Sequence, residues 1–170
     1  FVFSTTLGTA TLSSTAPTSI SISGNVYTLG IGLSGNPDGD EVLVVNPVDN
    51  SIYDATGNEA STSQSNNTEY LNDKVVPIIT SVALASDNST IAVTFSEAVD
   101  NSTSGAGALE VGDFAFSITG GTATLTSTTP SSISISGNVY TLGITLTGTP
   151  DGSEVLTVNP KDDSIYDADD

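Results

Sequence analysis

The sequence predicts an all-β fold, in which short antiparallel strands pack as Greek-key β-sandwich modules in tandem. Three observations predict it. The composition is rich in Thr, Val and Ile, which suit half-buried strands, and in Gly, Asn and Asp, which suit turns. Apolar and polar residues alternate over many short runs. A long segment of the chain also occurs twice.

The repeat determines the predicted organisation. The segment that begins at Phe1 returns at Phe114, and roughly 42 of 57 aligned positions are identical at an offset of about 113 residues. Identity that high within one chain indicates recent duplication, and usually an array of copies. The block 57–113 occurs once, so it holds the end of one copy and the start of the next.

The module boundary is predicted at Asp73-Lys-Val-Val-Pro77, a short segment that ends in proline between two strand-like stretches. Residues 1–73 are then the C-terminal part of one Ig-sized module, and residues 74–77 are a linker. Residues 78–170 are the next module, which lacks its last strand. In the earlier copy that last strand is represented by residues 67–72.

Alternation locates the strands of the second module. Residues 90–96 place Ile91, Val93 and Phe95 on one face, and residues 78–84 alternate in their later positions. Gly137-Asn138 is a two-residue hairpin signal, and residues 150–152 form a Pro-Asp-Gly turn. The remaining predicted strands are 109–118, 122–126, 131–136, 139–146 and 154–159.

Seven or eight strands with turns every 8–12 residues are typical of a β-sandwich. Eight simple up-and-down strands would put both ends of a module at one pole, whereas an extended array needs opposite poles. Either one candidate is not a strand, or a connection crosses between the sheets. The sequence leaves both alternatives open.

The charge balance excludes several classes of partner. The formal net charge is −18, because Lys74 and Lys161 are the only basic side chains. Such a surface repels nucleic acid and anionic lipid, since nothing neutralises phosphates, and it attracts cations. No apolar run approaches the roughly 20 residues that span a bilayer. We therefore expect no nucleic-acid partner and no direct membrane insertion by this segment.

The chain has no His and no Cys, so catalytic triads, imidazole bases and thiol nucleophiles are excluded. Carboxylate pairs can hydrolyse glycosides. However, the repeated acids Asp38/Asp151 and Glu41/Glu154 lie in predicted turns, with no Trp or Arg to form a sugar cleft. We expect that the chain is not an enzyme.

Two segments carry a resemblance to a known family. Residues 77–99, PIITSVALASDNSTIAVTFSEAV, resemble the opening of bacterial Ig-like repeats, which occur in very large surface adhesins, S-layer-type proteins and gliding-associated proteins. Residues 52–58, IYDATGN, resemble a loop common near the end of such modules. The resemblance covers one whole module.

The resemblance implies an Ig-like sandwich whose role is to extend, space or adhere. The expected function is a structural and adhesive repeat of a long extracellular bacterial surface protein or filament. It would act at the cell surface as a stalk or fibre-forming spacer. Its expected partners are neighbouring copies of the same repeat, and these include copies that associate laterally.

An alternative function is a carbohydrate- or ice-binding extracellular module that works through a Tyr or Thr face. Tyr27 and Tyr140 lie mid-strand among Val and Leu, which favours a place in or beside the core. Thr-rich runs such as residues 122–126 are more often the solvent faces of strands than ligand surfaces.

Calcium is the one cofactor that the sequence suggests, because hard cations bind carboxylate and carbonyl oxygens at turns. Strands 78–84 and 90–96 should be antiparallel neighbours, so the loop after residue 96 returns to the pole where Asp73 lies. Asp73, Glu97 and Asp100 are therefore candidate ligands of one ion at the module junction. Residues 71–77 also resemble the linker of cadherins, in which calcium stiffens domain junctions. The alternative is that Asp73 pairs with Lys74 or caps a turn.

A second candidate calcium site contains Asp54 in the first copy and its repeat, Asp167, in the second. The competing interpretation is ordinary turn chemistry. Asp54 precedes Gly57-Asn58, and an Asp side chain in such a turn bonds nearby backbone N–H groups without a metal.

Overall fold

The computed structural model describes residues 1–103 and 105–168, and it divides into two compact units, Phe1–Val75 (unit 1) and Val76–Asp170 (unit 2). The prediction of an all-β fold is confirmed. Every strand pair is antiparallel, and the one helix within the described ranges is the short 3₁₀ turn η1 (Val111–Asp113). None of these residues forms a helix long and apolar enough to cross a membrane.

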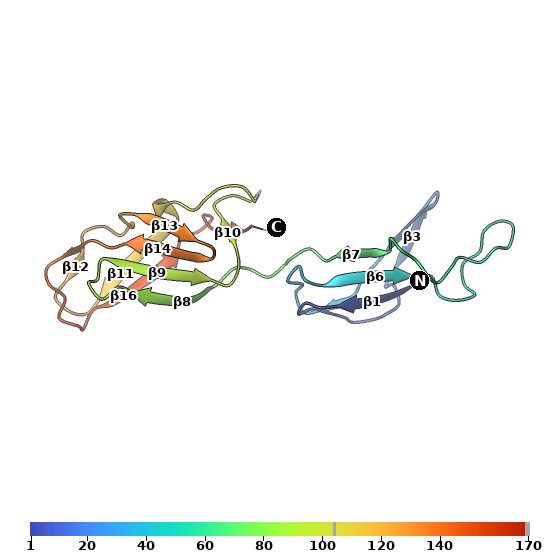
Figure 1. Cartoon of the computed structure of the whole chain (residues 1–170), viewed down its shortest axis with the longest axis horizontal. Helices are drawn as coiled ribbons and strands as arrows, with labels where there is room; N and C mark the ends of the chain where they lie inside the picture. Colours follow the sequence, from blue (N-terminus) through green and yellow to red (C-terminus); the bar gives the residue numbers. More distant parts are fainter. Residues whose placement is uncertain (104, 169–170) are drawn as a thin grey trace. The chain divides into compact units, whose positions relative to one another are not determined.

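Unit 2 contains a four-stranded sheet and a facing strand pair (Figure 1). The four-stranded sheet has the order β13-β14-β9-β8, with β8 (Ile79–Leu84), β9 (Thr90–Phe95), β13 (Ile133–Ser136) and β14 (Val139–Gly143). The facing pair is β11 (Phe114–Thr119) and β16 (Val155–Pro160). Two short pairs complete the unit: β12 (Thr124–Leu125) with β15 (Leu146–Thr147), and β10 (Val99–Asp100) with β17 (Tyr166–Asp167).

The core of unit 2 lies between the four-stranded sheet and the β11-β16 pair, which gives the unit a β-sandwich-like character. The predicted face of β9 is confirmed, because Ile91, Val93 and Phe95 are all buried. The Phe95 ring packs edge-on to the Tyr140 ring, with 5.5 Å between the ring centroids. The centroid of the Phe114 ring lies 6.3 Å from that of Phe95 and 6.1 Å from that of Tyr140. Offset and edge-on ring pairs of this kind add to the stabilisation from apolar burial.

The chain order bears on one of the two alternatives that the sequence left open, a connection that crosses between the sheets. From β9 the chain passes to β11 in the facing pair, returns to β13 and β14, and then crosses again to β16. Connections therefore do cross between the sheets.

Two predicted strands differ from the structure. The strand predicted at 109–118 begins only at Phe114, because η1 occupies Val111–Asp113 and the Glu110 N–H donates to the Asp113 carboxylate at 2.7 Å. The strand predicted at 139–146 is interrupted, and its two parts, β14 and β15, pair with different neighbours.

Unit 1 contains the three-stranded sheet β1-β6-β7, from β1 (Val2–Thr6), β6 (Val42–Asn46) and β7 (Thr68–Tyr70). Its other strands form two pairs: β2 (Thr11–Leu12) with β5 (Leu33–Ser34), and the hairpin of β3 (Ile20–Ser23) with β4 (Val26–Leu29). The strand predicted at 67–72 is present as β7.

The strand registers of the two units agree at the repeat offset. Phe3 lies opposite Val45 in unit 1, and Phe116 lies opposite Val158 in unit 2. The hairpins agree in the same way, with Ile22 opposite Tyr27 and Ile135 opposite Tyr140. The sequence repeat is therefore also a repeat of backbone pairing.

Candidate functional site

Glu41 and Glu154 occupy equivalent positions of the repeat, and both carboxylates are bonded to backbone N–H groups. In unit 2, Glu154 accepts hydrogen bonds from the backbone N–H groups of Thr122 and Ala123 at 2.9 and 3.0 Å. It also accepts from the N–H groups of Asp151 and Gly152, the latter at 3.0 Å. These bonds, led by that of Ala123, lower the pKa of Glu154 to about 2.

Glu41 makes the corresponding contacts in unit 1. Its carboxylate accepts from the Ala10 N–H at 2.6 Å and from the Asp38 N–H at 3.1 Å, and the residue has no exposed surface. Charged side chains are rarely buried unless they are bonded in this way. The repeated Glu therefore ties a turn to the chain segment after β1 or β11, and its role is structural.

A glycine makes room for each of these carboxylates. Gly8 and Gly121 both have positive φ, +65° and +60°, and a Cβ on either would overlap the carboxyl group of Glu41 or Glu154. Sequence reasoning missed this arrangement, because it treated the repeated acids as surface turn residues. The available signal was the retention of both Gly and Glu across the two copies, whereas the intervening Asp40 is replaced by Ser153.

Asp54 lies in a self-bonded loop. Its carboxylate accepts from the Thr56 N–H at 2.9 Å, from the Asn58 N–H at 2.8 Å and from the Asn58 side-chain amide at 2.8 Å. The Asn58 amide, with the Asn58 and Thr56 backbone and the Thr56 hydroxyl, holds the pKa of Asp54 well below its usual value. The loop thus shows the turn chemistry that was the competing interpretation for this residue.

Asp73 is buried, and it also forms a turn. Its Oδ1 accepts the Val75 N–H at 2.7 Å, while the Lys74 N–H donates to the Pro37 carbonyl at 2.8 Å. The Asp73 side chain lies against Gly39, which has a positive φ of +82°. Within unit 1, the Lys74 N–H therefore holds the end of the unit to the 37–39 turn, and the Asp73 side chain packs beside that turn.

Three predicted ligands lie in unit 2, and the structure brings two of them together. A carboxylate oxygen of Glu97 lies within 4.8 Å of a carboxylate oxygen of Asp167, and both residues are half-buried. β10 pairs with β17 so that Val99 lies opposite Asp167, which brings Asp167 beside the loop after β9. The Asp100 carboxylate instead accepts the Gly107 N–H at 2.9 Å, in its own loop.

Tyr140 is a core residue. It is 4 % exposed, and its hydroxyl donates to the Val99 carbonyl at 3.3 Å. Burial, with a smaller contribution from the Asp100 carboxylate, raises the pKa of Tyr140. A buried ring is not available as a platform for sugar.

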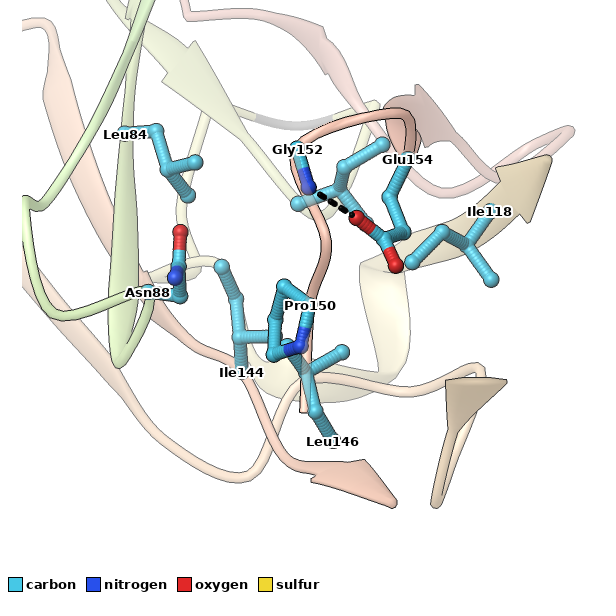
Figure 2. Close-up of a pocket in the computed structure, with 9 residues that line it drawn as sticks. Leu84, Asn88, Ile118, Ile144, Leu146, Pro150, Gly152 and Glu154 are labelled. Carbon is cyan, nitrogen blue, oxygen red and sulfur yellow. Dashed lines mark hydrogen bonds between the residues drawn. The ribbon is translucent and has the colours of Figure 1, made fainter. Parts of the chain in front are cut away.

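Unit 2 also has an apolar cavity of about 430 Å³ at one end of the sandwich (Figure 2). Its walls include Leu84, Ile118, Ile144 and Leu156, and its polar side chains are those of Asn88 and Glu154. Figure 2 shows the Glu154 carboxylate bonded to the Gly152 N–H, so this acid in the cavity wall is already bonded to the backbone.

The site chemistry is therefore mainly that of carboxylates bonded to backbone N–H groups, together with the Glu97–Asp167 pair.

Comparisons of the chain with protein-family models, with curated proteins and with solved structures found no match.

Proposed function

We propose that this chain belongs to a structural and adhesive repeat of a long extracellular bacterial surface protein or filament. In this proposal, Ig-like Greek-key sandwich modules follow one another in tandem and act as a stalk or fibre-forming spacer. The observation that carries the proposal is the internal repeat, in which about three quarters of the aligned residues are identical and the strand registers agree.

A repeat of this kind suits a mechanical role for a physical reason. Antiparallel strands of five or six residues are about 20 Å long, so each added module extends the protein by a fixed increment without new chemistry. The sequence contains no His and no Cys, the residues that most often act as catalytic bases and nucleophiles, and this favours a spacer over a catalyst.

The proposal is tested by locating the protein on its source cells. Antibodies against the 170-residue chain should label the cell surface or surface filaments in immunogold electron microscopy, and protease treatment of intact cells should remove the label. Label confined to the cytoplasm would contradict the proposal. A glycan array and an ice-affinity assay on the same chain test the alternative function, which specific binding in either assay would support.

We also propose that unit 2 binds a calcium ion through Glu97 and Asp167. Two carboxylates whose oxygens lie within 4.8 Å can both contact one Ca²⁺, since the ion binds oxygen ligands at about 2.4 Å. Because Asp167 is held on β17 and Glu97 follows β9, the ion would link β17 to the loop after β9. The prediction that Asp73 and Asp100 are ligands stays a prediction.

The calcium proposal is tested by thermal melting with Ca²⁺ and with excess chelator. Chelator should lower the melting temperature of unit 2, since an ion that binds only the folded state stabilises it by mass action. The variant Glu97→Gln/Asp167→Asn should melt equally with and without Ca²⁺. Asp54→Asn is the matched control, and it should keep the calcium response. Equal melting of the unaltered chain in both conditions would refute the site.

A further inference from the structure

One edge of the four-stranded sheet in unit 2 has no partner strand. β13 pairs with β14 on one side, and none of the described strands pairs with its other side (Figure 1). The equivalent strand of unit 1, β3, likewise pairs with β4 alone among the strands that the structure describes. Residues 19–31 and 132–144, which contain these two hairpins, are identical.

This open edge is a property of the whole repeat. Unit 2 holds β8 to β10, which precede β11, and unit 1 holds β7, which follows β6. The described strands of the two units therefore represent together one full period of about 113 residues. β7 pairs with β6, and β8 pairs with β9, so neither lies along the outer side of β3 or β13.

The other sheet edges are occupied or irregular. In the facing pair of unit 2, the Phe116 N–H on β11 donates to the Thr128 carbonyl at 2.7 Å. In unit 1 the strand equivalent to β16, β6, pairs with β7. β8 has a register shift between Ile79 and Ser81. Covering segments and bulges are devices that prevent strand pairing at an edge. β13 has neither, since its residues keep a regular register with β14.

The register of the hairpin determines which backbone groups lie at the open edge. The Gly143 N–H donates to the Ser132 carbonyl at 2.9 Å, and bonded and non-bonded positions alternate along an antiparallel pair. Ser134 is therefore a bonded position with β14. The N–H and carbonyl groups of Ile133 and Ile135 consequently point to the open edge.

The side chains at this edge suit a partner of the same sequence. Ile135 lies opposite Tyr140, on the core-facing side of the sheet, yet it is 46 % exposed. Ser134 and Ser136 are exposed on the other side. In an antiparallel pair of two β13 strands with Ile133 opposite Ile135, each exposed Ile135 gains an apolar neighbour from the second copy.

The charge pattern also favours this edge as a contact between copies. The chain has 20 acidic residues, and none of them lies in residues 1–37 or 114–150. The strands β13, β14, β9 and β8 contain no charged residue. Two chains of net charge −18 repel each other, and the repulsion is least where uncharged surfaces approach.

We propose that β13 pairs antiparallel with β13 of a second copy of this chain, and that β3 is the equivalent contact surface of unit 1. The pairing joins two four-stranded sheets into one and forms about four new backbone hydrogen bonds. This inference rests on the proposed function, because it names the surface through which fibre-forming repeats associate laterally.

A single pair of edges is a small contact, because β13 has only four residues. We therefore expect a weak association of the 170-residue chain, with a Kd on the order of 1 mM. Proteins that carry the edge many times would associate more tightly, since each further contact between two paired chains is intramolecular.

The test follows amide hydrogen exchange by NMR in the intact 170-residue chain. The Ile133 and Ile135 amides should exchange quickly in dilute solution. At about 2 mM, above the expected Kd, they should exchange about 2-fold more slowly, because more than half of the chains are then paired. Sedimentation should show association over the same range of concentration.

The variant Ile22→Pro/Ile135→Pro removes an outward N–H group from each edge. Proline is tolerated on an edge strand where its missing N–H would face solvent, so both hairpins should remain. This variant should lose the association, whereas the matched control Ile22→Val/Ile135→Val should keep it. The variant Ile22→Glu/Ile135→Glu, which places a charge at each edge without changing the backbone, should also lose it.

Three outcomes would overturn the inference. They are exchange at Ile133 and Ile135 that does not depend on concentration, association that leaves these amides unprotected, and association that the Pro and Glu variants retain. None of these results bears on the surface labelling of cells, so failure of this inference is distinguishable from failure of the proposed function.

Discussion

Replacing Leu142 by Ala should test whether β14 is the centre of the unit 2 core. The Leu142 side chain is 0 % exposed, and it faces Ile91 across one strand pair and Ile133 across the other. The change removes three carbon atoms, at about 0.8 kcal/mol each, and leaves a cavity between packed strands. We expect a loss of about 3 kcal/mol in the free energy of unfolding, within the range of about 2–5 kcal/mol for buried Leu→Ala changes.

The assay is a urea titration followed by the backbone amide NMR signals of β9 and β14, which report unit 2 separately from unit 1. A matched control is Ile135→Ala on the neighbouring strand β13. Ile135 is 46 % exposed, so its replacement should cost about 1 kcal/mol or less. For a domain of this size, about 3 kcal/mol corresponds to a fall of roughly 12–24 °C in melting temperature. Equal losses for the two variants, or a loss below about 1 kcal/mol for Leu142→Ala, would refute the described core.

Two further predictions concern the Glu154 carboxylate. Its pKa of about 2, below the usual 4.5, comes from backbone donors led by Ala123, so the ionised form stabilises unit 2 fully above pH 4.5. Melting temperature should fall as the pH drops from 4.5 toward 2, and Glu154→Gln should flatten that part of the curve; an unchanged pH profile in this variant would contradict the assignment. Gly121→Ala should lower the free energy of unfolding by about 2 kcal/mol more than Gly137→Ala does. Both glycines have positive φ, but only the Cβ added at position 121 displaces a bonded carboxylate. Urea titrations of the two variants check this, and similar losses would refute it.

Much of the local structure could be predicted from the sequence. Alternation over 90–96 identified the buried face of β9, because side chains on a strand point alternately to its two sides. The Gly-Asn pair at 137–138 identified the β13-β14 hairpin, since that turn needs residues that tolerate its backbone conformation. The turn chemistry around Asp54 was also readable, because all its donors lie within four residues of it.

Other features required the tertiary structure. Glu154 is bonded to Ala123, 31 residues away, and no local pattern separates such a carboxylate from one exposed on a turn. The proximity of Glu97 and Asp167 likewise depends on the pairing of β10 with β17, two strands of two residues each, which are too short to show any alternation.

The identical segments 19–31 and 132–144 show where the information in a sequence ends. The sequence alone determined that both form a hairpin with the same register, since turn and alternation are local properties. Only the tertiary structure decided that Tyr140 is buried while Tyr27 is half-exposed. The physical reason is that burial of a strand depends on the partner at its edge, and β9 supplies that partner to β14.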